Sequence, residues 1–118
     1  MNLVDLHNPL AVFFALAVCH ALADFPLQGE YIARQKARGS ADSPGAWIVA
    51  LAAHSLIHAG GVWLVTGSMA LGAVELGLHG LIDLGKGERK FGLVTDQILH
   101  LSCKLAYTVL IATGIVGH

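Results

Sequence analysis

One stretch of this chain limits its fold more than any other: residues 45–67, which read GAWIVALAAHSLIHAGGVWLVTG. The stretch contains no Asp, Glu, Lys or Arg. An α-helix rises about 1.5 Å per residue, so a helix of this length crosses the roughly 30 Å hydrocarbon core of a bilayer. Since such a helix would have no charged face to turn toward water, the stretch predicts a membrane span.

Three further apolar segments lie at residues 9–25, 69–85 and 92–117. Pro26 would end the first of them, because proline breaks a helix interior. The segment at 69–85 is short and contains Glu75 and Asp83, and pairing with residues 45–67 as a hairpin makes it credible as a span. At 118 residues the chain has room for one domain. We predict an all-α integral membrane domain over residues 1–118, built as a bundle of four transmembrane helices.

Composition agrees with a membrane protein. Charged residues make up 13% of the chain, against roughly 25% in soluble globular proteins, and hydrophobic residues make up 55%. A formal net charge of −1 gives no electrostatic reason to expect a nucleic-acid partner. A soluble four-helix bundle is the weaker alternative, since residues 45–67 offer no charged face.

The basic residues predict how the bundle is oriented. All but one lie between the first and second apolar segments or between the third and fourth: Arg34, Lys36, Arg38, Lys86, Arg89 and Lys90. Basic loops stay on the cytoplasmic side, so we expect a multi-pass protein of the bacterial inner membrane with both termini on the outer side. The N-terminus has no basic region, so no signal peptide is expected. Residues 28–43 have room for a short interfacial helix, whose basic residues would meet anionic lipid headgroups.

Each apolar segment carries two side chains of the metal-ligating type, four residues apart. The pairs are His20 and Asp24, His54 and His58, His79 and Asp83, and Asp96 and His100. A spacing of four puts both members on one face of a helix, and the rise per residue puts all eight in the half of the bundle nearer the basic loops. A charged side chain at the centre of a span costs roughly 2.5–3.5 kcal/mol and normally faces the bundle interior. We therefore predict that the eight converge on one internal cluster.

A cation would explain such a cluster, because three carboxylates would otherwise repel or take up protons. We predict one or two divalent transition metals, zinc foremost, with iron, manganese and nickel also suited to mixed imidazole and carboxylate ligands. The main alternative is a metal-free network of Asp and His, such as a proton relay. Cys19 and Cys103 form no motif and are interpreted as small buried hydrophobic residues.

Four other residues are candidates for supporting the cluster: Gln28, Glu75, Gln97 and Lys104. Glu75 precedes His79 by one turn and is either a ligand or a hydrogen-bond acceptor. Lys104 would neutralise a substrate anion or pair with a buried acid. The two glutamines would either hold the ligands in place or cap helix ends.

The motifs HALADFPLQ, HSLIH, HGLID and DQILH, in this order, resemble domain-of-unknown-function family 3307. That family consists of small bacterial and phage integral membrane proteins, and the resemblance covers nearly the whole chain. It implies a four-span membrane protein and supplies little biochemistry. The chain is more loosely similar to inner-membrane proteins described as metal-dependent hydrolases, which also carry His and Asp on short spans.

Two classes of function follow. An enzyme would use the metal to activate water and to polarise a lipid phosphoester or another membrane-associated ester or amide. Asp96 would be its general base, next to Gln97 and near a cytoplasmic opening between the first and fourth spans. A non-enzymatic protein would use the eight ligands to saturate two tetrahedral ions in a closed structural site, or would serve ion transport or a phage–host interaction. Membrane lipids are the expected partners, and a homo-oligomer or another membrane protein is compatible with either class.

Overall fold

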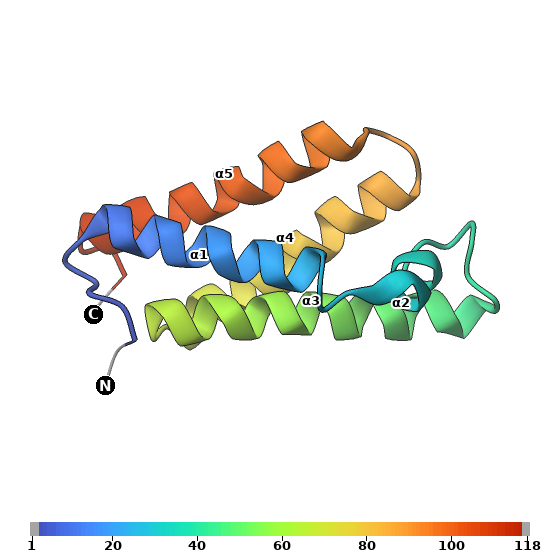
Figure 1. Cartoon of the computed structure of the whole chain (residues 1–118), viewed down its shortest axis with the longest axis horizontal. Helices are drawn as coiled ribbons and strands as arrows, with labels where there is room; N and C mark the ends of the chain where they lie inside the picture. Colours follow the sequence, from blue (N-terminus) through green and yellow to red (C-terminus); the bar gives the residue numbers. More distant parts are fainter. Residues whose placement is uncertain (1–2, 117–118) are drawn as a thin grey trace.

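The computed structural model of the chain describes residues 3–116. Over this range it contains five α-helices and no β-strand: α1 (Pro9–Asp24), α2 (Gly29–Gln35), α3 (Pro44–Thr66), α4 (Met69–Gly87) and α5 (Leu93–Ala112). Figure 1 shows the four longer helices running lengthwise beside one another, with the short α2 next to the first turns of α3. The predicted all-α class is confirmed, and α2 occupies the segment in which a short helix was expected.

The helix ends follow local sequence signals. The Asn8 side chain accepts a hydrogen bond from the backbone N–H of Ala11 at the start of α1, and Ser68 does the same for Leu71 at the start of α4. Side chains of this kind satisfy the unpaired donors of a first helical turn. The fourth segment was predicted to run to residue 117, but α5 ends at Ala112, because Gly114 has a φ of 75° and this left-handed conformation terminates a helix.

Helices α3 and α4 form the predicted hairpin. Gly67, with a φ of 71°, ends α3, and α4 begins two residues later. Close packing continues along the pair at Gly72, where a Cβ atom would lie 3.1 Å from the backbone oxygen of Ala59 and 3.3 Å from the Cβ of Trp63. Glycine therefore allows the two helices to approach closely.

The two basic segments lie at the same end of the molecule. Figure 1 shows both chain ends at one end of the bundle, and α2 and the α4–α5 connection at the other. Arg38, which follows α2, forms an ion pair with Glu88, which follows α4. The chain runs along the bundle four times, in α1, α3, α4 and α5, and so returns to the end at which it began. This arrangement agrees with the predicted alternation of the helices.

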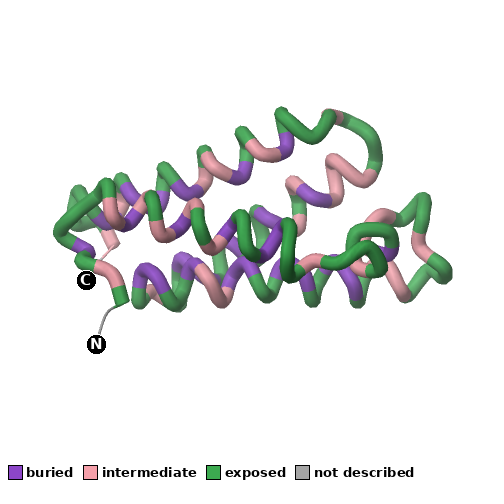
Figure 2. Tube along the Cα trace, in the orientation of Figure 1, coloured by how far each residue is buried: buried purple, intermediate pink, exposed green. Residues whose placement is uncertain are grey.

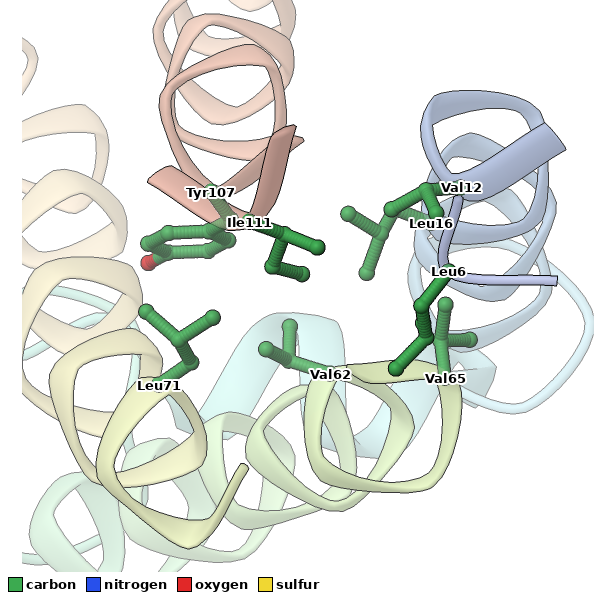
Figure 3. Close-up of a cluster of buried hydrophobic side chains, with 8 residues drawn as sticks. All are labelled: Leu6, Val12, Leu16, Val62, Val65, Leu71, Tyr107 and Ile111. Carbon is green, nitrogen blue, oxygen red and sulfur yellow. The ribbon is translucent and has the colours of Figure 1, made fainter. Parts of the chain in front are cut away.

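Polar side chains make up much of the buried interior, and many large hydrophobic side chains lie on the outside. One hydrophobic cluster lies toward the chain ends (Figure 3): Leu6, Val12, Leu16, Val62, Val65, Leu71, Tyr107 and Ile111. Elsewhere the interior is largely polar, while Phe14, Val49 and Leu81 are each 68–70% exposed. Figure 2 shows the buried positions lining the inside of the bundle along all four long helices. The helices thus turn apolar faces outward around a polar interior.

By length and composition, α3 is the one described helix able to cross a membrane by itself. Helices α1 and α2 meet the same condition only as a pair, bent by 86° between them. Four charged residues of α4 and α5 are buried inside the bundle, namely Glu75, Asp83, Asp96 and Lys104, whereas the Lys86 side chain is 35% exposed. The four predicted helices are present, but this criterion selects only one of them as a span.

Candidate metal centre

The structure brings all eight predicted site residues together. Each of the four long helices contributes its pair, and none of the eight residues is more than 8% exposed. The α3 pair lies near the middle of its helix, whereas in the α4 pair His79 lies near the middle and Asp83 lies one turn from the basic end. The prediction had placed every member in the half nearer the basic loops, and His58 is the one of the eight that lies past the midpoint of its helix.

Asp24 is surrounded by three imidazoles. Its Oδ1 atom lies 2.9 Å from His58 Nε2 and 3.1 Å from His54 Nε2, and its Oδ2 atom lies 3.2 Å from His20 Nε2. Gln97 Nε2 donates a hydrogen bond of 2.9 Å to Oδ2. The Asp24 carboxylate therefore contacts side chains from three helices: His20 of α1, His54 and His58 of α3, and Gln97 of α5.

Asp83 occupies a similar position on α4. Its Oδ1 lies 3.1 Å from His100 Nε2, and its Oδ2 lies 3.3 Å from His79 Nε2 and 3.4 Å from His54 Nε2. Lys36 Nζ also donates to Oδ2, at 2.8 Å. Since His54 Nε2 is near both Asp24 and Asp83, the two carboxylates belong to one continuous cluster.

The five imidazoles share one orientation toward the carboxylates. In each ring it is Nε2 that lies within 3.4 Å of an aspartate oxygen. The rings also pack on one another, with centroids 3.7 Å apart for His58 and His79 and 4.3 Å apart for His79 and His100. Five nitrogen lone pairs or N–H groups are thus directed into one small volume.

Three groups of atoms in the cluster have the proximity that a metal requires. Within each group, one potential ligand atom per residue lies within 4.8 Å of the others. The groups are Asp24, His54, His58 and His79; His20, His79 and His100; and Asp83, Asp96 and His100. The largest of them mixes three imidazoles with one carboxylate, a ligand set typical of zinc and of several other transition metals.

Comparison with known proteins identifies the family. A family described as a protein of unknown function, DUF3307, matches residues 12–116. The chain belongs to DUF3307. All eight cluster residues lie inside the matched range, whereas His7 and His118 lie outside it. No curated protein and no solved structure matches the chain.

The carboxylates of this DUF3307 protein differ in how their charge is balanced. Asp83 pairs with Lys36 at 2.8 Å, Asp96 lies 3.7 Å from Lys86, and Glu75 pairs with Lys104. The ion pairs formed by Asp24 within residues 3–116 involve histidines only. A buried carboxylate is costly unless it is paired or hydrogen-bonded, so Asp24 depends on the N–H donor of Gln97 and on its histidines, and a protonated imidazole or a bound cation would balance its charge.

Glu75 and Lys104 lie one helical turn from the cluster, toward the chain ends. They form a fully buried ion pair, and Tyr107 donates its hydroxyl to Glu75 Oε1 at 2.9 Å. Glu75 Oε2 also lies 3.4 Å from His79 Nδ1. Of the two roles expected for Lys104, the structure therefore shows pairing with a buried acid. Sequence reasoning had not singled out Tyr107.

The two candidate glutamines have different contacts. Gln97 touches the cluster directly, because its Nε2 donates to Asp96 Oδ2 as well as to Asp24, and its Oε1 lies 2.9 Å from His20 Nε2. Gln28 donates to the backbone oxygen of Asp24 at 3.1 Å. Gln97 thus positions cluster side chains, and Gln28 holds the end of α1.

Sequence reasoning also missed Lys36 and Lys86 as cluster residues, having used them only for orientation. No spacing rule connects them to the carboxylates, since Lys36 and Asp83 are 47 residues apart. Both lysines line a hollow of about 160 Å³ that reaches Asp83 between α2 and α4. The expected opening was between α1 and α5, next to Asp96. The described hollow lies instead on the α2 side and reaches a different aspartate.

Proposed function

We propose that this DUF3307 protein is a membrane-embedded, metal-dependent hydrolase whose four long helices all cross the bilayer. The distribution of side chains supports four spans. The charged residues within α4 and α5 that would disqualify a lipid-exposed helix, namely Glu75, Asp83, Asp96 and Lys104, are each at most 4% exposed. Ionisable residues inside membranes normally face the bundle interior in this way. The outward faces of the same helices are apolar.

The observation that carries the proposed metal is the environment of Asp24. Three buried imidazole nitrogens lie within 3.2 Å of this carboxylate, and no lysine or arginine balances it among the described residues. A divalent cation held by Asp24, His54, His58 and His79 would neutralise the carboxylate and accept the imidazole lone pairs. Zinc fits this ligand set best, and iron, manganese and nickel also accept it.

The lysines favour one ion over two. A second cation that shares no ligand with the first would have to use Asp83, Asp96 and His100, because the group of His20, His79 and His100 shares His79 with the Asp24 group. Lys36 and Lys86 already lie beside these two carboxylates. Since an ammonium and a metal ion would repel each other at this distance, we expect the second position to bind metal weakly.

Hydrolysis is supported by the position of Asp96. The metal would act as a Lewis acid and would activate water. Asp96 lies outside the Asp24 group, and its Oδ1 makes no hydrogen bond within the described part of the chain, with His100 Nε2 3.2 Å away. Gln97 donates to both Asp96 and Asp24, so it holds this carboxylate beside the proposed metal as a general base. A lipid phosphoester, or another membrane-associated ester or amide, is the proposed substrate class.

Elemental analysis of protein purified in detergent tests the metal. We expect about one equivalent of transition metal per chain, and its loss in Asp24→Ala and His58→Ala, with a lower thermal unfolding temperature in both. His7→Ala, which alters a histidine near the chain end, should keep the metal. Wild-type protein that is metal-free, and whose stability is unchanged by added zinc or by a chelator, would leave only the metal-free polar network.

A closed structural site is the second candidate, because the Asp24 group supplies four ligands and structural zinc sites are usually four-coordinate. Asp96→Asn separates the candidates. If Asp96 is a base, the variant keeps its metal and loses turnover of a chromogenic aryl phosphodiester. If wild-type protein has a full complement of metal and hydrolyses neither this diester nor an aryl ester, the hydrolase is excluded and a structural or transport role remains.

A further inference from the structure

The hollow between α2 and α4 has a wall of unusual composition for the interior of a helical bundle. Its lining residues are Gln28, Ala33, Lys36, Ala37, Asp83, Lys86 and Gly87. The side chains of Lys36 and Lys86 are 12% and 35% exposed. Two ammonium groups, one from the residue that follows α2 and one from α4, therefore share one recess, and the small residues leave it about 160 Å³.

Both lysines have donors to spare. An ammonium group has three N–H donors and no acceptor. Lys36 uses one of them for Asp83 Oδ2, and Lys86 lies 3.7 Å from Asp96 Oδ2, which is beyond hydrogen-bond distance. Gln28 adds an amide whose Oε1 has no hydrogen-bond partner within residues 3–116. The recess therefore offers several N–H donors and one acceptor to a ligand.

A cation bound at the proposed metal site would make the charge of the recess favour an anion. Lys36 and Lys86 balance Asp83 and Asp96, so the wall by itself is close to neutral. Asp83 Oδ2 lies 3.4 Å from His54 Nε2, which in turn lies 3.1 Å from Asp24 Oδ1. A divalent cation held at Asp24 and His54 would thus lie next to the recess and make it net positive.

We propose that this hollow is a binding site for a phosphate-type oxyanion, held by Lys36 and Lys86 beside the metal centre. The inference rests on the proposed metal function and names the substrate group that this centre would take. Ammonium groups recognise phosphate through charge-assisted hydrogen bonds. The Oε1 atom of Gln28 would accept a hydrogen bond from the hydroxyl of a protonated phosphate. Metal and anion binding should strengthen each other, since coupling between two sites is reciprocal.

Equilibrium dialysis with radiolabelled orthophosphate tests the site. The protein is kept in a maltoside detergent, which contains no phosphate, and is studied both zinc-loaded and after chelator treatment. We expect saturable binding to zinc-loaded protein. Lys36→Gln and Lys86→Gln should each weaken it about tenfold or more, the usual effect of losing a hydrogen bond to a charged group. Lys90→Gln removes the same charge from an exposed position at the same end and should leave binding unchanged.

Two further measurements identify the source of the phosphate and detect variants that have misfolded or lost metal. The first measurement compares unlabelled orthophosphate with a soluble short-chain phosphatidic acid as competitors of the radiolabelled orthophosphate. If phosphatidic acid competes at a much lower concentration, the site binds a lipid headgroup. If the two compete at equal concentrations, the site binds free phosphate. Lys86 is partly exposed, so Lys86→Gln remains informative if Lys36→Gln misfolds. Metal content is measured on every sample.

The outcomes separate this inference from the proposed function. The anion site is overturned if metal-loaded wild-type protein binds no orthophosphate. It is also overturned if Lys86→Gln and Lys90→Gln reduce orthophosphate binding equally. Either result leaves the metal centre standing. Protein without metal overturns the proposed function. If such protein still binds orthophosphate through Lys36 and Lys86, the anion site is supported independently.

Discussion

At the scale of single residues, His79 is the side chain with partners on both sides of its ring. Its Nε2 lies 3.3 Å from Asp83 Oδ2, and its Nδ1 lies 3.4 Å from Glu75 Oε2. Histidines that bind metal through one nitrogen commonly donate the other N–H to a carboxylate, which fixes the tautomer. We therefore expect Glu75 to have two separable roles: it would orient His79 when a metal is bound, and it balances Lys104.

Replacing Glu75 and Lys104 together should separate these roles. Glu75→Gln alone leaves Lys104 buried without its partner, which costs about 3–5 kcal/mol, and should weaken metal binding about 10–100-fold through His79. In the Glu75→Gln and Lys104→Met double variant, thermal stability should largely return, whereas zinc affinity, measured by competition with a chelator, should stay low. Recovery of both quantities in the double variant would show that Glu75 acts only as the partner of Lys104.

At the scale of helices, the α3–α4 hairpin holds the cluster together. Helix α3 supplies His54 and His58, and α4 supplies His79, so three of the four residues proposed to bind metal depend on this one pair. The helices approach closely at Gly72, next to the backbone of Ala59. Small residues permit such approaches between membrane helices.

Gly72→Ala should therefore destabilise the protein more than a matched change on the same helix. The added Cβ would lie 3.1 Å from the Ala59 oxygen, and overpacking of this kind costs about 1–3 kcal/mol. In the control Gly77→Ala, the new Cβ meets no atom within 4 Å, so the higher helix propensity of alanine should leave stability equal or slightly raised. Thermal unfolding and zinc affinity in detergent measure the difference. Equal effects of the two substitutions would contradict a close contact at Gly72.

At the scale of the whole molecule, the described residues form a bundle with two chemically different ends. Lys and Arg lie at the end formed by α2 and the α4–α5 connection, apart from Lys104, which is buried beside Glu75. The opposite end holds the hydrophobic cluster and both chain ends (Figures 1 and 3). In a bilayer, the basic end should face the cytoplasm, with the hollow at Asp83 opening toward it.

Labelling of introduced cysteines should report this orientation. After Cys19 and Cys103 are replaced by serine, a membrane-impermeant maleimide applied to intact cells should modify Leu3→Cys and Ile115→Cys, whose positions are 74% and 75% exposed. Gly39→Cys and Lys90→Cys should react only after lysis. The reverse pattern would place the proposed site on the outer side, and equal labelling of all four positions would contradict a membrane-spanning bundle.

The sequence by itself determined which residues share a helix face and roughly where each helix lies. The spacing of four residues predicted that pairs such as His54 and His58 share a helix face. The apolar runs bounded by Pro26 and by Gly67-Ser68 predicted the helical segments. Both signals act within a few residues of the chain. The helix at 28–43 was expected for the same reason. The early end of α5 was missed, because the apolar pattern continues beyond Gly114.

Tertiary structure decided how the pairs meet and which charges cancel. Helical periodicity fixes a face, but it does not fix the rotation or the relative depth of two helices. These are set by packing between helices, as at Gly72. Only this packing brings Lys36 to Asp83 and Lys104 to Glu75, and surrounds Asp24 with three histidines and Gln97. The same long-range contacts placed the hollow beside α2, because a recess forms between surfaces whose residues lie far apart in the chain.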